Sequence, residues 1–146
     1  MLDEVWLYTD GAARANPGPA AAGFRILTSL GELLFEHEES LGDRTNNQAE
    51  YAALILGLEA CRAYTRNRVW VGSDSQLLVK QMTGEWRVKN LELQARQADA
   101  RARAGVFREV QYRHYSRTHP EISAVDQALN RLLDLEARRG SSQAAV

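Results

Sequence analysis

The sequence predicts an α/β fold in which a five-stranded mixed sheet is flanked by helices. Two observations support this prediction. Three strand-like segments separated by turn residues follow one another in the first part of the chain, which favours antiparallel pairing. After Asn47, helical and strand-like periods alternate, and such an alternation requires at least one parallel crossover in the sheet.

The antiparallel part begins with residues 5–8, a short apolar and aromatic segment typical of a central strand. The next segment, GAARANPGPAA, contains the Gly, Asn and Pro residues of a turn. Residues 21–27 and 32–41 predict a hairpin around the break at residues 29–31. The run EHEE at residues 36–39 lies in this hairpin, and we interpret it as an exposed strand face rather than a metal site.

The helical part begins at Asn47, because apolar side chains then recur at helical spacing. Thr45 and Asn46 are candidate N-cap residues. The remaining expected elements are a strand from Val69, a helix over 75–82, a loop over 84–90, a helix over 91–104, a strand over 107–115 and a helix over 122–139.

Length and composition predict one compact unit. The chain has 146 residues, 45% of them hydrophobic, and a chain of this size can bury a core of its own. We expect a single domain over residues 1–139 and a flexible C-terminal tail over residues 140–146. Cys61 lies in an apolar helical run, which favours a small buried side chain over a catalytic thiol.

Two observations limit the partners of the chain. No segment is as apolar as a membrane span, and the first residues lack the pattern of a signal peptide, so we expect a cytoplasmic protein without a membrane partner. With 18 basic and 19 acidic residues, the formal net charge is −1. No overall positive field therefore attracts a polyanion, and any attraction to nucleic acid must be local or carried by metal ions.

Four acids lie at or near junctions between the expected elements: Asp10, Glu50, Asp74 and Asp126. Asp10 and Asp74 each follow a strand, and ligand sites in such sheets lie beyond the carboxyl ends of parallel strands. Each acid also has a simpler interpretation. Asp10 alone is typical of a turn, and Glu50 and Asp126, in the first turns of helices, would stabilise helix dipoles.

If the four acids lie close together in the folded protein, they indicate a metal site instead. Carboxylates held close together repel one another unless a cation neutralises them. A site with only oxygen ligands favours Mg²⁺ or Mn²⁺ over zinc. Nucleases that transfer phosphoryl groups use two such ions to activate water and to stabilise the leaving oxygen.

Four motifs resemble those of type 1 ribonuclease H. They are YTDGAARANPG, TNNQAEYAAL, VGSDSQLLVKQMTGEW and HPEISAVDQAL, and the resemblance extends from about Leu7 to Leu133. It implies a ribonuclease H-like fold and an endoribonuclease that hydrolyses the RNA strand of RNA/DNA hybrids, leaving 3′-hydroxyl and 5′-phosphate ends. It also implies two Mg²⁺ ions per site, with Mn²⁺ as a substitute, held by the four catalytic acids Asp10, Glu50, Asp74 and Asp126.

The resemblance further implies which residues bind the hybrid. Glu50 would accept a hydrogen bond from a ribose 2′-hydroxyl, the group that distinguishes RNA from DNA. Thr45 would contact a phosphate of the DNA strand. The residues expected near the minor groove, its sugars and its bases are Gly11, Asn16, Asn46, Asn47 and Gln76. For the Asn residues, helix capping and turn formation stay open as an alternative.

The segment GEWRVKN resembles the form of the family that lacks a basic protruding helix. Trp86, Arg87 and Lys89 would then hold the DNA strand, because an aromatic ring and cations suit sugar and phosphate contacts. The alternative is that Trp86 packs against the protein and the cations are solvated. Arg101 and Arg103 are expected to lie on a helix surface.

The chain departs from the family pattern before its last helix. The loop histidine that helps product to leave would fall at Ser116, so Arg117 and His119 are the candidate residues for product release. This departure leaves two alternatives open, namely a hybrid-binding module with weak or lost turnover and a structural domain whose acids only cap helices. A 3′–5′ exonuclease of related fold is a further alternative. We expect a monomer that acts on RNA/DNA hybrid without an obligate protein partner.

Overall fold

The computed structural model describes residues 1–144, with side chains through Gly140. Its elements are β1 (Glu4–Ala13), β2 (Gly18–Leu27), β3 (Leu33–Arg44), α1 (Asn46–Cys61), β4 (Arg68–Ser73), α2 (Gln76–Met82), α3 (Leu91–Ala104), β5 (Glu109–His114) and α4 (Pro120–Ala144). The five strands form one sheet in the order β3-β2-β1-β4-β5. The predicted fold class is therefore confirmed.

The sheet is mixed, as the sequence predicts. β2 pairs antiparallel with both β1 and β3, whereas β4 runs parallel to β1 and β5 runs parallel to β4. The central strand β1 thus has an antiparallel neighbour on one side and a parallel neighbour on the other. Its pairing with β4 ends at Tyr8 and Gly72, and beyond that point this side of β1 is free for other groups.

β1 is longer than the sequence predicts. It continues past Tyr8 to Ala13, so that the turn is confined to residues 14–17. The reason is the pairing of Ala12 and Ala13 with small residues of β2, which extends the ladder through the segment expected to turn. Asp10 lies inside this ladder, opposite Gly23. The interpretation of Asp10 as a turn residue is therefore wrong.

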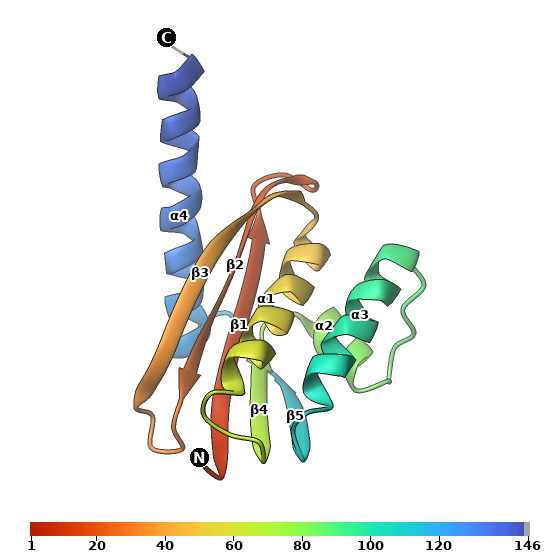
Figure 1. Ribbon diagram of the computed structural model, residues 1–146. Helices are drawn as coiled ribbons and strands as arrows, with labels where there is room; N and C mark the ends of the chain where they lie inside the picture. Colours follow the sequence, from red (N-terminus) through yellow and green to blue (C-terminus); the bar gives the residue numbers. More distant parts are fainter. Residues whose placement is uncertain (145–146) are drawn as a thin grey trace.

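The helices cover the two faces of the sheet. Figure 1 shows α1 in front of the sheet with α2 and α3 beside it, and α4 on the opposite side. Apolar side chains of α1, such as Leu54 and Leu58, pack on Leu7 and Ile26 of the sheet. Complete burial of such a side chain contributes about 1.5–3 kcal/mol. Cys61 belongs to this core and is buried, as expected.

The other face has a smaller core. Val125, Leu129 and Leu133 of α4 pack around Ala21 of β2. Because β1 alternates its side chains between the two faces, Asp10 shares the α4 side with Tyr8 and Ala12. The sheet face that carries Asp10 is thus the one that α4 crosses.

The connection between α2 and α3 consists of residues 83–90 and contains no further helix. Val88 is buried in the main core, whereas Trp86 is exposed. This short connection agrees with the expected form without a protruding helix.

α4 differs from its predicted bounds at both ends. It begins at Pro120 rather than Ile122, because proline suits the first helical position. It continues to Ala144 rather than ending at Arg139, since no proline follows and Gly140 keeps a negative φ. Glycine costs a helix about 1 kcal/mol without ending it. Residues 145 and 146 of the expected tail lie outside the described residues.

The end of α4 projects beyond the sheet (Figure 1). Among the helices that the structure describes, none combines the length and the apolar character of a membrane-spanning segment.

Candidate active site

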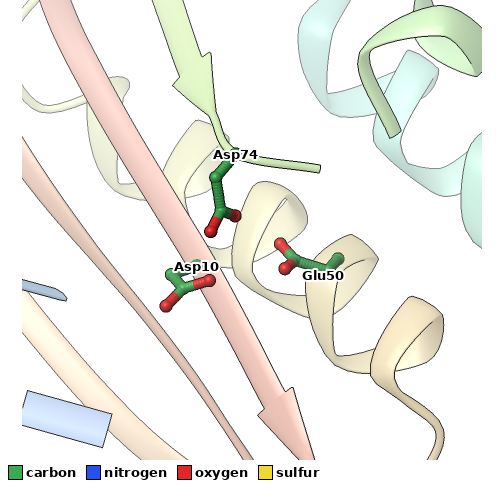
Figure 2. Close-up of side chains that lie close together, drawn as sticks. All are labelled: Asp10, Glu50 and Asp74. Atoms are coloured by element: carbon green, nitrogen blue, oxygen red, sulfur yellow. The ribbon is translucent and has the colours of Figure 1, made fainter. Parts of the chain in front are cut away.

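Three carboxylates meet at one edge of the sheet. Asp10 comes from β1, Glu50 from α1 and Asp74 directly follows β4. One oxygen atom of each carboxylate lies within 4.8 Å of the other two. Figure 2 shows the three side chains pointing toward one another. The fold thus brings together acids that are far apart in the sequence.

The parallel pairing of β1 and β4 places Asp10 and Asp74 together. The ladder ends at Tyr8 and Gly72, and each aspartate follows two residues later along its own strand. Both carboxylates therefore lie just beyond the point where the parallel β1–β4 ladder ends, which is the region of such sheets where ligands commonly bind.

Glu50 joins them because α1 approaches β1 closely at Gly11. A Cβ atom at Gly11 would lie 2.3 Å from the carbonyl carbon of Ala49 and 2.4 Å from the backbone nitrogen of Glu50. Only glycine leaves room for this contact. The carboxylates of Glu50 and Asp10 lie close enough that each affects the pKa of the other.

Asp10 and Glu50 are buried, and neither forms a salt bridge within the described part of the chain. Asp10 is 4% exposed and Glu50 is 9% exposed, and the Oε2 atom of Glu50 has no hydrogen-bond partner among the described residues. Burial, followed by the charges of Asp74 and Asp126, raises the pKa of Asp10 to about 8. Burial and the charge of Asp10 also raise the pKa of Glu50.

Asp74 is less deeply buried and has cationic neighbours. Burial raises its pKa, while the positive charge of Arg117 has the opposite effect. The side-chain Nε2 of His114 lies 3.1 Å from the backbone carbonyl oxygen of Asp74. The Asp74 segment is therefore held from β5 as well as from its own strand.

Asp126 lines the same site but does not belong to the group formed by Asp10, Glu50 and Asp74. It lines a cavity of about 300 Å³ together with Asp10, Glu50 and Asp74, yet its side chain is exposed. Asn130 Nδ2 donates a hydrogen bond of 3.3 Å to Asp126 Oδ2. Sequence analysis missed Asn130, although its spacing of four residues from Asp126 on a helix was a usable signal.

The interpretation of Glu50 and Asp126 as dipole-stabilising residues is wrong. α1 has no acid in its first turn, and the acid in the first turn of α4 is Glu121. Glu50 and Asp126 lie one turn further along, and the dipole effect falls off within the first turn.

These residues fit a hard divalent cation. All of the donors are oxygen atoms, as Mg²⁺ and Mn²⁺ prefer. The buried Glu50 oxygen without a partner offers a free ligand. Burial, followed by repulsion from neighbouring carboxylates, raises the pKa values of Asp10 and Glu50, and a bound cation would offset both effects.

Several of the expected substrate residues surround this cavity. Gly11, Asn46 and Asn47 line it. Asn46 Oδ1 accepts a hydrogen bond of 3.0 Å from Ala13 N, and Asn16 Oδ1 accepts one of 3.0 Å from Asn46 N. The two asparagines thus tie the β1–β2 turn to the start of α1, which confirms turn formation as one of their roles.

Thr45 is the N-cap of α1, as expected, and its hydroxyl accepts a hydrogen bond of 3.1 Å from Gln48 N. Asn46 is the first helical residue rather than the cap. Gln76 begins α2, is exposed and does not line the cavity. Sequence analysis missed Ala12 and Ser75, which do line it; Ser75, a serine directly before a helix, was a recognisable N-cap.

A second cavity, of about 680 Å³, lies against the α2–α3 connection. Trp86 and Arg87 line it, and so does Arg101, which was expected only as a surface residue. Trp86 is 45% exposed, so its ring is partly covered by the protein and partly open to solvent. Lys89 is exposed on the same connection but does not line the cavity.

The two residues proposed for product release lie in different surroundings. Arg117 lines the carboxylate cavity. His119 does not; its ring stacks on Tyr8 at 5.1 Å, and its Nδ1 accepts a hydrogen bond of 3.2 Å from Glu121 N. Ser116, where the family histidine would fall, bonds to Thr118 through their hydroxyl groups at 2.8 Å.

Comparison with known proteins gives consistent matches. Residues 8–129 match the protein family described as reverse transcriptase-like. Ribonuclease HI of Halobacterium salinarum is 38% identical over 130 residues, which cover 89% of this chain and 64% of that protein. The chain thus spans less than two thirds of this relative, and it spans 38% of a bifunctional protein of Mycobacterium tuberculosis.

Two solved structures are similar over nearly their whole length. The N-terminal RNase H domain of the Mycobacterium tuberculosis protein has a TM-score of 0.89 at 34% identity, covering 95% of this chain and 99% of that one. LC11-RNase H1 in complex with an RNA/DNA hybrid has a TM-score of 0.79 at 33% identity, covering 88% and 99%.

Proposed function

This chain belongs to the ribonuclease H family, and on that premise we propose that it is a metal-dependent endoribonuclease that hydrolyses the RNA strand of RNA/DNA hybrids. The observation that carries the proposal is the convergence of Asp10, Glu50 and Asp74, of which Asp10 and Glu50 are buried and form no salt bridge within the described residues. The complex of LC11-RNase H1 with a hybrid supports the choice of substrate.

We propose that the four acids together bind two divalent ions. Asp10 and Asp74 would hold the ions, Glu50 would hold one of them, and Asp126 would complete the second site from α4. When bound, two Mg²⁺ or Mn²⁺ ions supply the activation of the attacking water and the stabilisation of charge on the leaving oxygen. The burial of Asp10 and Glu50 keeps both carboxylates fixed in orientation and largely free of bulk water.

The expected 3′-hydroxyl and 5′-phosphate ends of the cleaved RNA strand determine which bonds form and break. The oxygen of a water molecule forms a bond to phosphorus while the bond from phosphorus to the 3′-oxygen breaks in line with it. The water loses a proton and the 3′-oxygen gains one. The products are a 3′-hydroxyl and a 5′-phosphate.

RNA selection rests on the residues beside the carboxylates. Glu50 lines the cavity, and its carboxylate is our candidate acceptor for a ribose 2′-hydroxyl, which DNA lacks. Gly11, Asn46 and Asn47 line the cavity and are suited to the minor-groove side of the hybrid. Asn16, Thr45 and Gln76 flank them as further contacts, Thr45 to a phosphate of the DNA strand.

The DNA strand would lie along the α2–α3 connection. Trp86 and Arg87 line the second cavity, and Lys89 adds a positive charge on the same connection. Because the net charge of the whole chain is −1, this local basic group has to provide the attraction to phosphates.

Arg117 is our candidate for the residue that replaces the loop histidine, since it lines the carboxylate cavity. His119, our other candidate, lacks that support because it does not line the cavity. We propose that the protein acts as a monomer without an obligate partner, because one chain supplies all four acids and both cavities. The cytoplasm stays our proposed location.

The experiment that tests this function is digestion of an internally labelled RNA/DNA hybrid beside single-stranded RNA, duplex RNA and duplex DNA. We expect cleavage of the hybrid alone, with Mg²⁺ or Mn²⁺ and not with EDTA. Release of label only from the ends of an end-labelled hybrid would instead indicate the exonuclease. Hybrid binding without cleavage in either ion would indicate a binding module.

A further inference from the structure

The connection between β5 and α4, residues 115–119, carries Arg117 at its centre and an aromatic residue at each end. The rings of Tyr115 and His119 lie 4.7 Å apart. Both contact Tyr8 of β1, with centroid distances of 6.0 Å for Tyr115 and 5.1 Å for His119. The two ends of the loop are therefore packed on the strand that carries Asp10.

Backbone hydrogen bonds hold the same loop. Tyr115 N donates to Ser73 O at 2.9 Å, directly before Asp74. Inside the loop, His119 N donates to Ser116 O at 3.0 Å, and Thr118 N donates to Ser116 Oγ at 3.2 Å. The loop is thus a closed turn tied to β4 rather than an open excursion into solvent.

The sheet leaves room for this packing at Gly72. A Cβ atom there would lie 2.7 Å from Cε2 of Tyr115 and 2.9 Å from Cδ1 of Tyr8. Any side chain at this position would push the Tyr115 ring away from the sheet, and the absence of one lets the ring lie over the strand that leads to Asp74.

Arg117 is the residue that this arrangement places at the cavity. Its guanidinium forms no ion pair within the described part of the chain, although it lines the cavity with the four acids. Its positive charge acts on Asp74. Without a salt bridge of its own, the position of Arg117 depends on the loop that carries it.

We propose that Tyr8, Tyr115 and His119 form an aromatic clamp that fixes the 115–119 loop and so positions Arg117 at the carboxylate cavity. The three clamp residues are positioning residues that act through Arg117. This inference rests on the proposed function, because its catalytic part concerns cleavage of the hybrid.

The first test is Tyr115→Leu, which removes the ring but keeps an apolar side chain. We expect kcat for hybrid cleavage to fall about tenfold. A misplacement of about 1 Å in an active site can lower the rate about a hundredfold, and we expect a smaller displacement of Arg117. KM should stay unchanged, because Asn46, Asn47 and Trp86 are untouched. Tyr115→Phe keeps the ring and should retain the wild-type kcat.

The matched control is Phe35→Leu. It makes the same aromatic-to-leucine change in the stack that Phe35 forms with Phe24 and His37, away from the cavity. We expect wild-type kcat for this variant. Thermal unfolding of both variants shows whether each is folded at the assay temperature. If Tyr115→Leu is unfolded there, Tyr8→Leu takes its place.

The second test combines Tyr115→Leu with Arg117→Ala. If the clamp acts through Arg117, the tyrosine change lowers kcat no further in the variant that lacks Arg117, because the two effects are not additive. An equal loss from Tyr115→Leu in both backgrounds would overturn the proposal. So would wild-type kcat in Arg117→Ala.

Amide hydrogen exchange supplies a measurement that does not depend on cleavage. In Tyr115→Leu, the amides of Thr118 and His119 should exchange about tenfold faster than in the wild type, while amides in β3 keep their rates. Unchanged rates in the loop would show that the rings do not hold it. If the wild type cleaves no hybrid, the proposed function and the role of Arg117 fail together, whereas exchange still decides whether the clamp exists.

Discussion

Two groups of acids in this molecule carry the same kind of charge but differ in their origin in the fold, their burial and their partners. Asp10, Glu50 and Asp74 come from separate elements, converge within 4.8 Å and are largely buried. The acids of β3, among residues 36–39, come from one strand and are mostly exposed. In that strand Glu36 pairs with Arg25, and Glu39 lies 3.0 Å from His37.

The difference shows what makes a group of acids a site. The β3 acids lie mostly at the surface, and Glu36 has Arg25 as a cationic partner, so little is gained by binding an ion there. Asp10 and Glu50 are buried and form no salt bridge within the described residues, and the Glu50 Oε2 atom has no hydrogen-bond partner there. Burial and convergence, rather than the number of acids, create a demand for a cation. Each of the following predictions tests this contrast.

The largest expected effect is on cleavage. Asp10→Asn should lower kcat roughly a thousandfold, because loss of an ion ligand removes several kcal/mol of transition-state stabilisation. Hybrid binding and the fold should be retained. Glu38→Gln, the matched change in β3, should leave kcat unaltered. Single-turnover cleavage with purified variants measures both, and an active Asp10→Asn protein would refute the assignment.

The next effect is on stability without metal. Burial raises the pKa of Asp10 to about 8 in the folded protein, so the folded carboxyl keeps a proton that the unfolded chain releases above about pH 4. Through Asp10 alone, the free energy of unfolding therefore falls as pH rises from about 4 to about 8, by up to about 1.4 kcal/mol per unit.

Urea denaturation in EDTA across this range measures the effect. Asp10→Asn should reduce the pH dependence, to which Glu50 and Asp74 still contribute, and Glu38→Gln should not change it. Equal slopes for the wild type and Asp10→Asn would contradict the prediction.

Divalent ions should restore the stability that the metal-free protein loses as the pH rises. At neutral pH, Mg²⁺ or Mn²⁺ at a hundredfold excess over its dissociation constant should stabilise the fold by about 2.7 kcal/mol. The shift in thermal unfolding should disappear in Asp74→Asn and persist in Glu38→Gln. A shift of the same size in both variants would place the ion elsewhere.

Gly11→Ala should move Glu50 away from Asp10 and Asp74. The added Cβ would lie 2.3–2.4 Å from the backbone of Ala49 and Glu50, so α1 has to move away from β1. We expect a loss of about 1–3 kcal/mol in stability and a smaller ion-induced shift. A variant that keeps the wild-type response to Mn²⁺ would show that the close approach is not needed.

The smallest effect is expected in β3. Glu36→Gln removes an exposed partner of Arg25, which still pairs with Glu121 at 2.8 Å. Such surface pairs contribute about 0–1 kcal/mol. Denaturation should therefore show little change and cleavage none, and a large change in either would mean that the β3 acids are more than a solvated strand face.

The order and type of the elements followed from the sequence alone. Apolar periodicity predicted the α1 stripe from Tyr51 to Cys61, and turn residues separated the strands, because both signals depend only on near neighbours in the chain. The end of β1 was predicted wrongly, since its extension to Ala13 depends on pairing with β2. The end of α4 was also wrong, because no local signal stops the helix at Arg139.

The sequence by itself also singled out the acids Asp10, Glu50, Asp74 and Asp126, through their motifs and their places near the ends of elements. Only the tertiary structure decided that three of them form a close group while Asp126 stands exposed at the cavity wall. It likewise decided that Arg117 reaches the cavity and His119 packs on Tyr8. Spacing and periodicity are local properties, whereas burial and convergence arise from contacts between distant segments that exist only once the sheet and its helices have packed together.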